Sequence, residues 1–311
     1  MKRVRRRKDL HYGDRVFALV LRLASIAVAI VLLLIGLFLF KAALPSIHKF
    51  GWNFFVTSVW DPVHEDFGAL PVIFGTVASS MLAILISAPL SIGVALFLTE
   101  LAPGRLANVI GFLIEMLAAI PSVVYGLWGI FVLAPWLRTH VEPLLGSTLG
   151  FLPLFQGPPY GVGMLAAGIV LAIMVTPTIS SICREVFRAI PRDQREAALA
   201  LGATRWEMMR LSVLRSSRPG IFGAVILGLG RALGETMAVT MVIGNRASIS
   251  ASLFAPAQTM ASTIANEYVE ATSDMHLSAL MEIGIALFAV TFIINSIARL
   301  LVWRVGSEAS R

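Results

Sequence analysis

Residues 196–245 read EAALALGATRWEMMRLSVLRSSRPGIFGAVILGLGRALGETMAVTMVIGN, and this stretch decides the fold. A polar, arginine-rich segment continues directly into an apolar run, and Arg231 and Glu235 lie near the middle of that run. Charged side chains at bilayer depth are energetically costly, so they mark functional sites by default. The stretch therefore predicts a membrane protein that handles something charged and carries a cytoplasmic segment on the same helix.

The composition indicates the same class of protein. Hydrophobic residues make up 57% of the 311 residues and charged residues only 14%, a balance that is unusual for a soluble domain of this length. The net charge of +7 comes from Lys and Arg in short segments beside apolar runs. No basic face is interleaved with stacking aromatics, so we expect no nucleic-acid partner. The single cysteine, Cys183, excludes an internal disulfide and a cysteine-based metal cluster. The five histidines lack ligand spacing, and we expect no metal site, no cofactor and no catalytic residues.

Six apolar runs are long enough to cross a hydrocarbon core, which takes about 20 helical residues. They cover residues 16–40, 71–99, 109–136, 161–183, 220–244 and 277–303. Pro121 should interrupt the third run, because proline breaks a helix. The chain then divides into a basic cytoplasmic N-terminus (1–15), a first span with its outer loop (16–70), a core of five spans (71–303) and a cytoplasmic tail (304–311). The core contains the longest cytoplasmic segment, residues 184–219.

The distribution of positive charge predicts the orientation. The inner segments 1–15, 100–108, 184–219 and 299–311 hold nineteen Lys and Arg residues, and the outer loops 41–70, 137–160 and 245–276 hold four. Lys and Arg accumulate on the cytoplasmic side of membrane proteins. Both termini are therefore expected in the cytoplasm.

The charged residues within the apolar runs are the candidates for a substrate pathway. Arg231 and Glu235 are four residues apart, so on one continuous helix they would share a face. One interpretation is an internal salt bridge that neutralises two buried charges. The other is that Arg231 offers a bidentate fork to an oxyanion while Glu235 accepts a proton-bearing oxygen. Phosphate keeps at least one P–OH at neutral pH whereas sulfate keeps none, so the carboxylate would favour phosphate. Glu115, in the third run, is a further pathway candidate and a candidate partner of Arg231.

The cytoplasmic segment 184–219 has the features of a docking surface. Glu196 could open a helix whose positive end favours it, two alanines allow close packing, and Gly202 permits a turn. Large apolar side chains three residues apart would then serve as docking anchors. The alternative is a solvated amphipathic connector, which would not need an exposed tryptophan. The predicted coupling residues are Glu196, Ala197, Ala198, Gly202, Trp206 and Met209.

Two of these patterns resemble a known family. The Glu196-Ala-Ala start followed by Gly202 resembles the EAA loop of bacterial ABC-transporter permeases, which docks on the ATP-hydrolysing subunit. The stretch GLGRALGETMAVTMVIGN (228–245) resembles the signature of the PstC-type permease subunit of the bacterial phosphate-specific ABC transporter. FGALPVIFGT (67–76), ALFLTELAPG (95–104) and EMLAAIPSVVYGLWG (115–129) fit that family as well. The resemblance implies an all-α integral membrane protein with six transmembrane helices in the type I, MetI-like fold of ABC importer permeases. It also implies that Arg231 and Glu235 are transport-sensitive; with Thr236 and Glu115 they form the predicted substrate pathway.

The resulting functional prediction is a permease subunit that moves inorganic phosphate inward across the bacterial cytoplasmic (inner) membrane. The resemblance implies a complex, embedded in membrane lipid, with a second homologous permease as heterodimer, two ATP-binding subunits and an external phosphate-binding protein. The chain carries no ATP site, because no Gly-x4-Gly-Lys surrounds any of its four lysines, so ATP hydrolysis is expected in a partner. The alternatives are a permease for another oxyanion, such as molybdate or sulfate, and a membrane signalling scaffold that senses phosphate without moving it.

Overall fold

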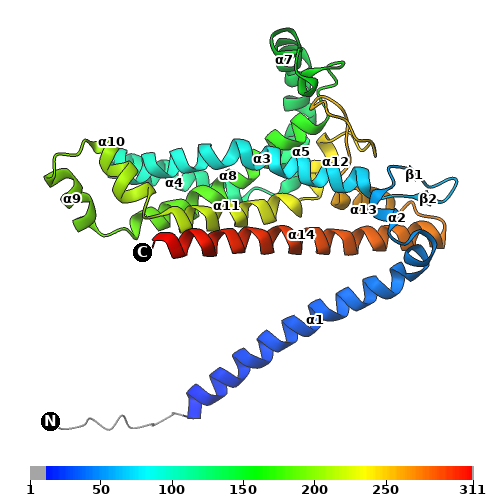
Figure 1. The fold of residues 1–311 in the computed structure, drawn as a ribbon, viewed down its shortest axis with the longest axis horizontal. Helices are drawn as coiled ribbons and strands as arrows, with labels where there is room; N and C mark the ends of the chain where they lie inside the picture. Colours follow the sequence, from blue (N-terminus) through cyan, green and yellow to red (C-terminus); the bar gives the residue numbers. More distant parts are fainter. Residues whose placement is uncertain (1–11, 310–311) are drawn as a thin grey trace.

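Four long helices form the body of the protein (Figure 1). The structure, a computed structural model, describes the backbone of residues 12–309 and the side chains of residues 13–300. The predicted N-terminus 1–15 therefore lies mostly outside the described residues, and of the tail 304–311 only the backbone as far as residue 309 is described, as part of the last helix. The four helices run side by side, with α8 packed between α3 and α11, and α14 packed on α11. Their bounds are α3 (Leu70–Leu96), α8 (Met164–Arg188), α11 (Arg218–Leu233) and α14 (Asp274–Ala309).

Five helical runs within the described residues are long and apolar enough to cross a membrane. They are Gly13–Phe50, Leu70–Leu101, Ser122–Leu149, Met164–Arg188 and Asp274–Leu300. Four of them contain most or all of the predicted spans 16–40, 71–99, 161–183 and 277–303. The backbone of such runs pairs all its polar groups internally, which is why helices form there. The third and fifth predicted spans differ from the prediction.

Each of these two spans is divided into separate helices. The predicted span 109–136 contains α4 (Gly104–Ala119) and α5 (Ser122–Trp128), because proline has no N–H and disfavours a helical residue before it; Ile120 is extended (ψ 128°). The predicted span 220–244 divides into α11 and α12 (Met237–Val242) at residues 234–236. The prediction of one continuous fifth helix was therefore wrong.

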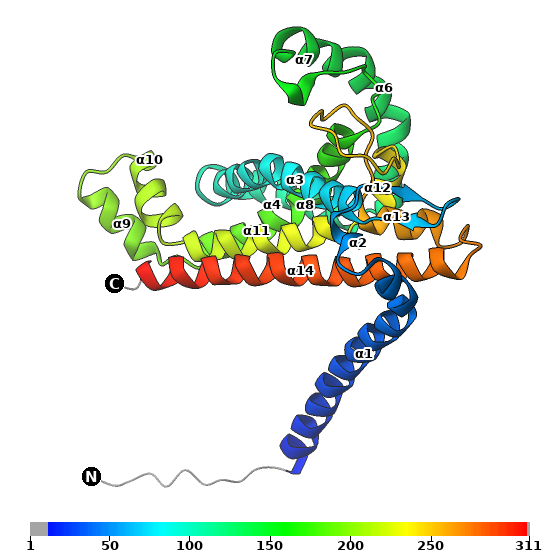
Figure 2. The same cartoon turned by 45° about the vertical axis from the view of Figure 1, so that its right-hand side comes forward.

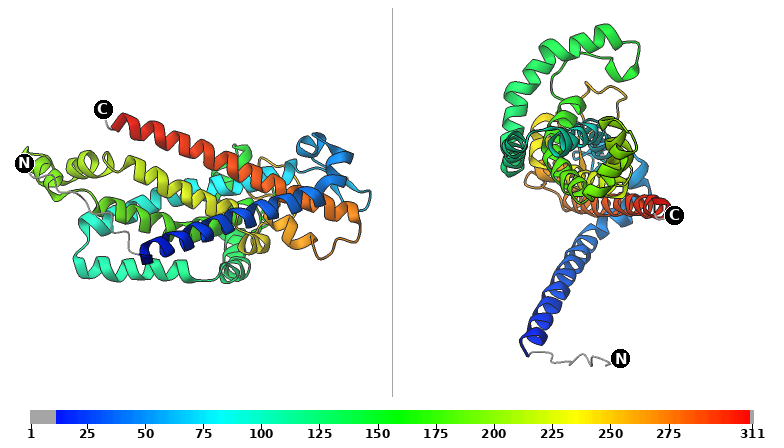
Figure 3. Two further views of the ribbon diagram at one scale, coloured as in Figure 1. Left: turned by 90° about the horizontal axis from the view of Figure 1, so that it is seen from below. Right: turned by 90° about the vertical axis from the view of Figure 1, so that its left-hand side faces the viewer.

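The helical segment 129–149 begins in the bundle, where Leu133 and Leu137 are buried, and its end at α7 projects away from the bundle (Figures 1 and 3). This region was predicted to become an outer loop from residue 137, but it is helical as far as Leu149. Its prolines, Pro135 and Pro143, did not end it; each comes just after a π-helical turn, where the α-helical hydrogen-bond ladder is already interrupted. The elements are η2 (Gly129–Leu133), α6 (Ala134–Trp136), η3 (Leu137–Val141), α7 (Glu142–Leu149) and η4 (Pro153–Phe155).

The first helix, α1 (Tyr12–Phe50), contacts α14 near its C-terminal end and diverges from the bundle toward its N-terminus (Figure 2). Near the contact, the backbone N–H of Ser46 donates to the hydroxyl of Ser278 at 3.0 Å. This N–H follows Pro45, which lies inside the helix. A side chain of α14 therefore supplies a hydrogen bond at the position where proline disturbs the α1 ladder.

The two ends of the bundle carry different structures (Figures 1 and 2). One end holds short elements of the predicted outer loops: α2 (Asn53–Val56), the antiparallel strands β1 (Trp60–Asp61) and β2 (Asp66–Phe67), and α13 (Met260–Glu267). The opposite end holds the predicted cytoplasmic elements: η1 (Phe97–Leu101), α9 (Arg192–Ala200), α10 (Arg205–Met208) and η5 (Met209–Leu214). The loops thus separate into the two sets that the charge distribution predicted.

Candidate functional site

Arg231 and Glu235 lie on either side of the break in the fifth span. Arg231 belongs to the last turn of α11, while Glu235 follows the helix end at Leu233. The Glu235 carboxylate accepts the backbone N–H of Ala238 at 3.3 Å, so it caps the start of α12. The two side chains form no ion pair among the described residues. The inference that they share one helix face was wrong, because the helix ends between them.

The hydrogen-bond partner of Arg231 is a hydroxyl on another helix. Its Nη1 atom lies 3.4 Å from Oγ1 of Thr178, which belongs to α8. The arginine side chain is exposed in this chain and contacts no carboxylate among the described residues. Thr178 was not a predicted site residue. Its only sequence signal is that it follows Pro177 inside an apolar run, where hydroxyls can satisfy freed backbone groups.

The break between α4 and α5 lies beside the helix that follows the second break. The carbonyl of Leu117 would pair with the N–H of residue 121, but that residue is proline. The Tyr125 hydroxyl donates to this carbonyl at 2.7 Å. Helix α5 packs tightly on α12, because a Cβ at Gly126 would lie only 3.2 Å from the Cα of Ala238. The helices that follow the two breaks are therefore in direct contact.

Chemically, this arrangement offers hydrogen-bond donors for an anion. A guanidinium that no carboxylate neutralises can bind an oxyanion through two parallel N–H groups. Thr236, the last residue before α12, has its hydroxyl near the carbonyl of Gly234 (3.4 Å). The structure thus brings Arg231, Glu235 and Thr236 into one region and adds Thr178.

Glu115, the fourth predicted pathway residue, is placed elsewhere. It forms an ion pair with Arg184 of α8, so Arg184, and not Arg231, is its partner. Gly111 makes this pair possible, because a Cβ at that position would overlap the Arg184 guanidinium. The pair connects α4 to α8. Sequence reasoning counted Arg184 among the cytoplasmic charges and missed it as a partner within the bundle.

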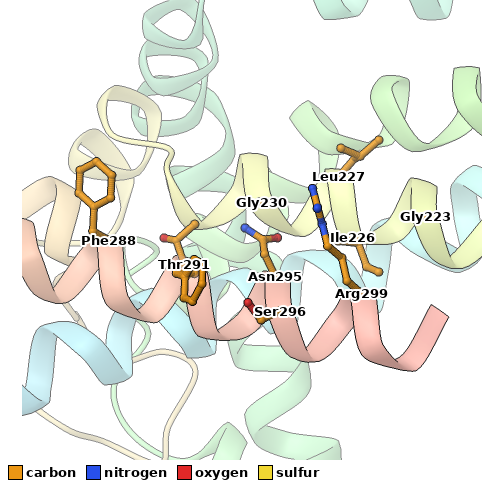
Figure 4. A pocket seen from close by; sticks show the side chains of 10 residues that line it. Gly223, Ile226, Leu227, Gly230, Phe288, Thr291, Asn295, Ser296 and Arg299 are labelled. Carbon is orange, nitrogen blue, oxygen red and sulfur yellow. The ribbon is translucent and has the colours of Figure 1, made fainter. Parts of the chain in front are cut away.

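A wide groove on another part of α11 does not contain this arginine. It encloses about 1020 Å³ between α11 and α14 (Figure 4). Most of its lining is apolar, with Thr291, Asn295 and Arg299 as its longer polar side chains. Gly230, the residue before Arg231, faces Asn295 across the groove. The groove and the Arg231 region therefore lie on different sides of α11.

The predicted coupling segment, which is the cytoplasmic segment 184–219, contains two short helices, α9 and α10, on either side of a glycine turn. Gly202 has φ +87°, a conformation that favours glycine, so its predicted role as a turn residue is confirmed. Glu196 lies in the middle of α9; the acidic residue in the first turn is Asp193. Ala198 packs on a cluster of buried apolar residues near the cytoplasmic end, here called the inner core cluster, which includes Cys183, Phe187 and Val213. Ala197 is exposed.

The two predicted anchors face opposite ways. Trp206 is 59% exposed, as a docking residue must be, but Met209 is only 6% exposed and belongs to the inner core cluster. The prediction of Met209 as a surface anchor was wrong, because its side chain packs in the same buried cluster as Phe187 and Val213. Three leucines of the same segment are exposed instead: Leu199, Leu201 and Leu211.

A capping box, which sequence reasoning missed, orients Trp206. The Thr204 hydroxyl accepts the N–H of Glu207 at 3.3 Å, and the Glu207 carboxylate accepts the N–H of Thr204 at 2.8 Å. The signal was present as Thr-x-x-Glu at residues 204–207. The backbone and hydroxyl hydrogen bonds from Thr204 lower the pKa of Glu207. The box is therefore complete when this carboxylate is ionised.

A bundle of apolar helices, with an exposed arginine beside a break in one span and a helical segment displayed at one end, is typical of a multi-span membrane transport subunit. The family model described as "Binding-protein-dependent transport system inner membrane component" matches residues 87–307. The chain belongs to this family.

Relatives extend the match over nearly the whole chain. The phosphate transport system permease protein PstC of Mesorhizobium japonicum is 49% identical over 299 residues, which cover 95% of this chain and 91% of the relative. The protein of the same name from Pasteurella multocida is 44% identical and covers 98% of this chain and 96% of the relative. The protein of that name from Methanocaldococcus jannaschii, there called probable, is 38% identical, with 96% of each chain covered.

Solved structures support the fold. A chain of a bacterial alginate ABC transporter, solved with a pentasaccharide-bound periplasmic protein, superposes with a TM-score of 0.62 at 17% identity, covering 92% of this chain and 94% of that one. A chain of the MetNI methionine ABC transporter gives 0.56 at 16% identity, covering 75% and 94%. The predicted all-α, MetI-like fold of an ABC importer permease is confirmed. The number of six spans stays a prediction.

Proposed function

We propose that this chain is the transmembrane permease subunit of an ATP-driven importer that translocates inorganic phosphate into the cytoplasm. The observation that carries the proposal is the 49% identity, over 95% of the chain, to a phosphate transport system permease. The exposed Arg231, held beside a hydroxyl and free of carboxylates among the described residues, supplies the chemistry that a phosphate pathway needs.

In this proposal, Arg231 binds the oxyanion and Glu235 discriminates between oxyanions. The guanidinium donates two parallel hydrogen bonds to phosphate oxygens, and the hydroxyl of Thr178, 3.4 Å from Nη1, is close enough to assist. Thr236 is assigned to the same pathway. Glu235 is half-buried, two residues past the end of α11. Its carboxylate accepts a hydrogen bond from a P–OH and repels sulfate, which has no proton to donate. Glu115 acts at a distance, through the ion pair that connects α4 to α8.

The proposed complex has four kinds of subunit. A second, homologous permease pairs with this chain, two ATP-binding subunits bind on the cytoplasmic side, and a phosphate-binding protein delivers the substrate from outside. The apolar surface around Trp206 and its neighbouring leucines supports the docking of an ATP-binding subunit at the coupling segment. Both termini lie in the cytoplasm, in agreement with the positive-charge bias.

Uptake of labelled phosphate into proteoliposomes that contain the whole complex tests the proposal. Wild-type complex should import phosphate when ATP is enclosed, and excess sulfate or molybdate should not compete. Competition by either anion would favour a permease for that oxyanion, and binding-protein-dependent ATP hydrolysis without uptake would favour a sensor.

Variants at the break test the two assigned roles. Arg231→Gln and the double variant Arg231→Gln, Glu235→Gln should both lose uptake, and Arg231→Lys should be impaired because one ammonium cannot reproduce the guanidinium fork. Glu235→Gln should lose discrimination against sulfate. Arg246→Gln, which alters an exposed arginine of the outer loop, is the matched control and should keep normal uptake. Normal uptake by the double variant would refute the ligand role of Arg231.

A further inference from the structure

One arginine of the coupling segment points back into the bundle. Of the eight arginines in residues 184–219, only Arg184 and Arg195 form ion pairs among the described residues. The Nη2 atom of Arg195 lies 2.8 Å from Oε1 of Glu100. Both side chains are largely buried, 17% exposed for the arginine and 7% for the glutamate. The pair joins α9 to η1, the short helix that continues α3.

The same guanidinium also holds the end of α8. Nη2 donates to the carbonyl of Phe187 at 2.8 Å, and Nη1 donates to the carbonyl of Ile190 at 2.6 Å. Carbonyls at a helix C-terminus lack intrahelical partners and carry partial negative charge, so a cation there is favourable. Pro191 follows directly and cannot donate an N–H. One side chain therefore fixes α9 to the ends of both α3 and α8.

This contact differs from ordinary surface ion pairs. An exposed pair contributes little to structure, whereas this largely buried pair, together with the two hydrogen bonds from the same guanidinium to backbone carbonyls, restricts the relative positions of the segments it joins. The two ends of the coupling segment are also hydrogen-bonded to each other, because the Ser212 hydroxyl of η5 donates to the carbonyl of Gln194 in α9 at 3.2 Å. Displacement of either end is therefore expected to displace Arg195, the neighbour of Gln194.

Helix α3 leads from this point to the opposite end of the bundle. Near its N-terminus, the Thr76 hydroxyl accepts the N–H of Met260, the first residue of α13, at 2.9 Å. Thr76 and Glu100 are 24 residues apart, which is roughly 36 Å of helix at about 1.5 Å per residue. Glu100 and Thr76 thus lie toward opposite ends of one continuous helical run, Leu70–Leu101.

We propose that Arg195 and Glu100 form a joint through which displacement of the coupling segment by ATP hydrolysis moves α3 and, through it, the outer end of the permease. This inference rests on the proposed function, since it assumes that an ATP-binding subunit acts on the coupling segment. Arg195 and Glu100 are positioning residues: they touch no substrate and act through α3. Without the joint, the segment moves while α3 does not, so ATP hydrolysis continues without opening the outer end.

The test uses the whole complex in proteoliposomes and measures assembly, ATP hydrolysis and phosphate uptake separately. Glu100→Gln and Arg195→Gln each leave one buried charge without its partner and are expected to lower thermal stability as well. The double variant Glu100→Gln, Arg195→Gln leaves no unpaired charge, so it separates coupling from folding. Arg195→Lys keeps a cation that can reach Glu100. Arg192→Gln, an exposed arginine of the same helix, is the matched control.

The double variant should assemble and hydrolyse ATP at a rate within about twofold of wild type, while phosphate moved per ATP falls about fivefold or more, the lower range of coupling between sites. Arg195→Lys should recover part of this loss, and Arg192→Gln should equal wild type. Wild-type phosphate per ATP in the double variant would overturn the joint. Absence of phosphate uptake by the wild-type complex would instead refute the proposed function, so the two failures are distinguishable.

Discussion

The contact between α11 and α8 at Gly228 allows a quantitative test of how the arginine region is held. Gly228 is buried three residues before Arg231, and α8 approaches it closely. A Cβ added at this position would lie 2.7 Å from Cδ1 and Cγ1 of Ile179 and from Cγ1 of Val175. Carbon atoms in good contact are about 3.5–4.0 Å apart, so Gly228→Ala must push the two helices apart by roughly 1 Å.

The expected cost follows from these contacts. Two of the three atoms sit on Cβ of β-branched side chains whose χ1 angles are restricted, so they cannot rotate away cheaply. Overpacking of this kind costs about 1–3 kcal/mol, and the upper end applies here. Alanine recovers about 1 kcal/mol through its better helix propensity. The net destabilisation is therefore about 2 kcal/mol.

Gly223→Ala on the same helix is the control, because a Cβ there meets no atom within 4 Å. It should be neutral or stabilising by up to about 1 kcal/mol. Thermal unfolding of the detergent-solubilised protein should give a lower Tm for Gly228→Ala than for Gly223→Ala. Phosphate uptake should fall as well, because a shift of roughly 1 Å takes Arg231 out of hydrogen-bond range of Thr178, now 3.4 Å away. Equal Tm values for the two variants would refute the packing argument.

Two further predictions concern the coupling segment and the orientation. Trp206→Ala should weaken binding of the ATP-binding subunit by about 2 kcal/mol, and so reduce its co-purification, without lowering Tm. Met209→Ala, at a buried position, should instead lower Tm. Unchanged co-purification of the Trp206→Ala variant would reject Trp206 as an anchor. In a Cys183→Ala background, a cysteine at the exposed Val269 should react with an impermeant thiol reagent on intact cells, and one at the exposed Asp193 should react only after the membrane is opened. The opposite labelling pattern would reverse the proposed topology.

The sequence alone determined the features that depend on local pattern. Apolar runs long enough to cross a bilayer must become helices, because no water is present there to pair with an open backbone. The helix break at Pro121 and the turn at Gly202 follow from the covalent structure of single residues and were confirmed. The family also followed from sequence, because its signature at 228–245 is a continuous stretch.

The tertiary structure alone decided which side chains meet. The partner of Glu115 is Arg184, 69 residues away, and that of Arg231 is Thr178, 53 residues away. In an apolar chain the same hydrophobic pattern is compatible with many rotations and crossing angles of the helices. The direction that each polar side chain faces is fixed only when bulky side chains of one helix pack against the glycines of another. The inward turn of Met209 has the same origin. Apolar helical segments could be predicted from sequence because length and charge are properties of a single segment. The contacts of Arg231 and the ion pair of Arg195 exist only where separate segments pack.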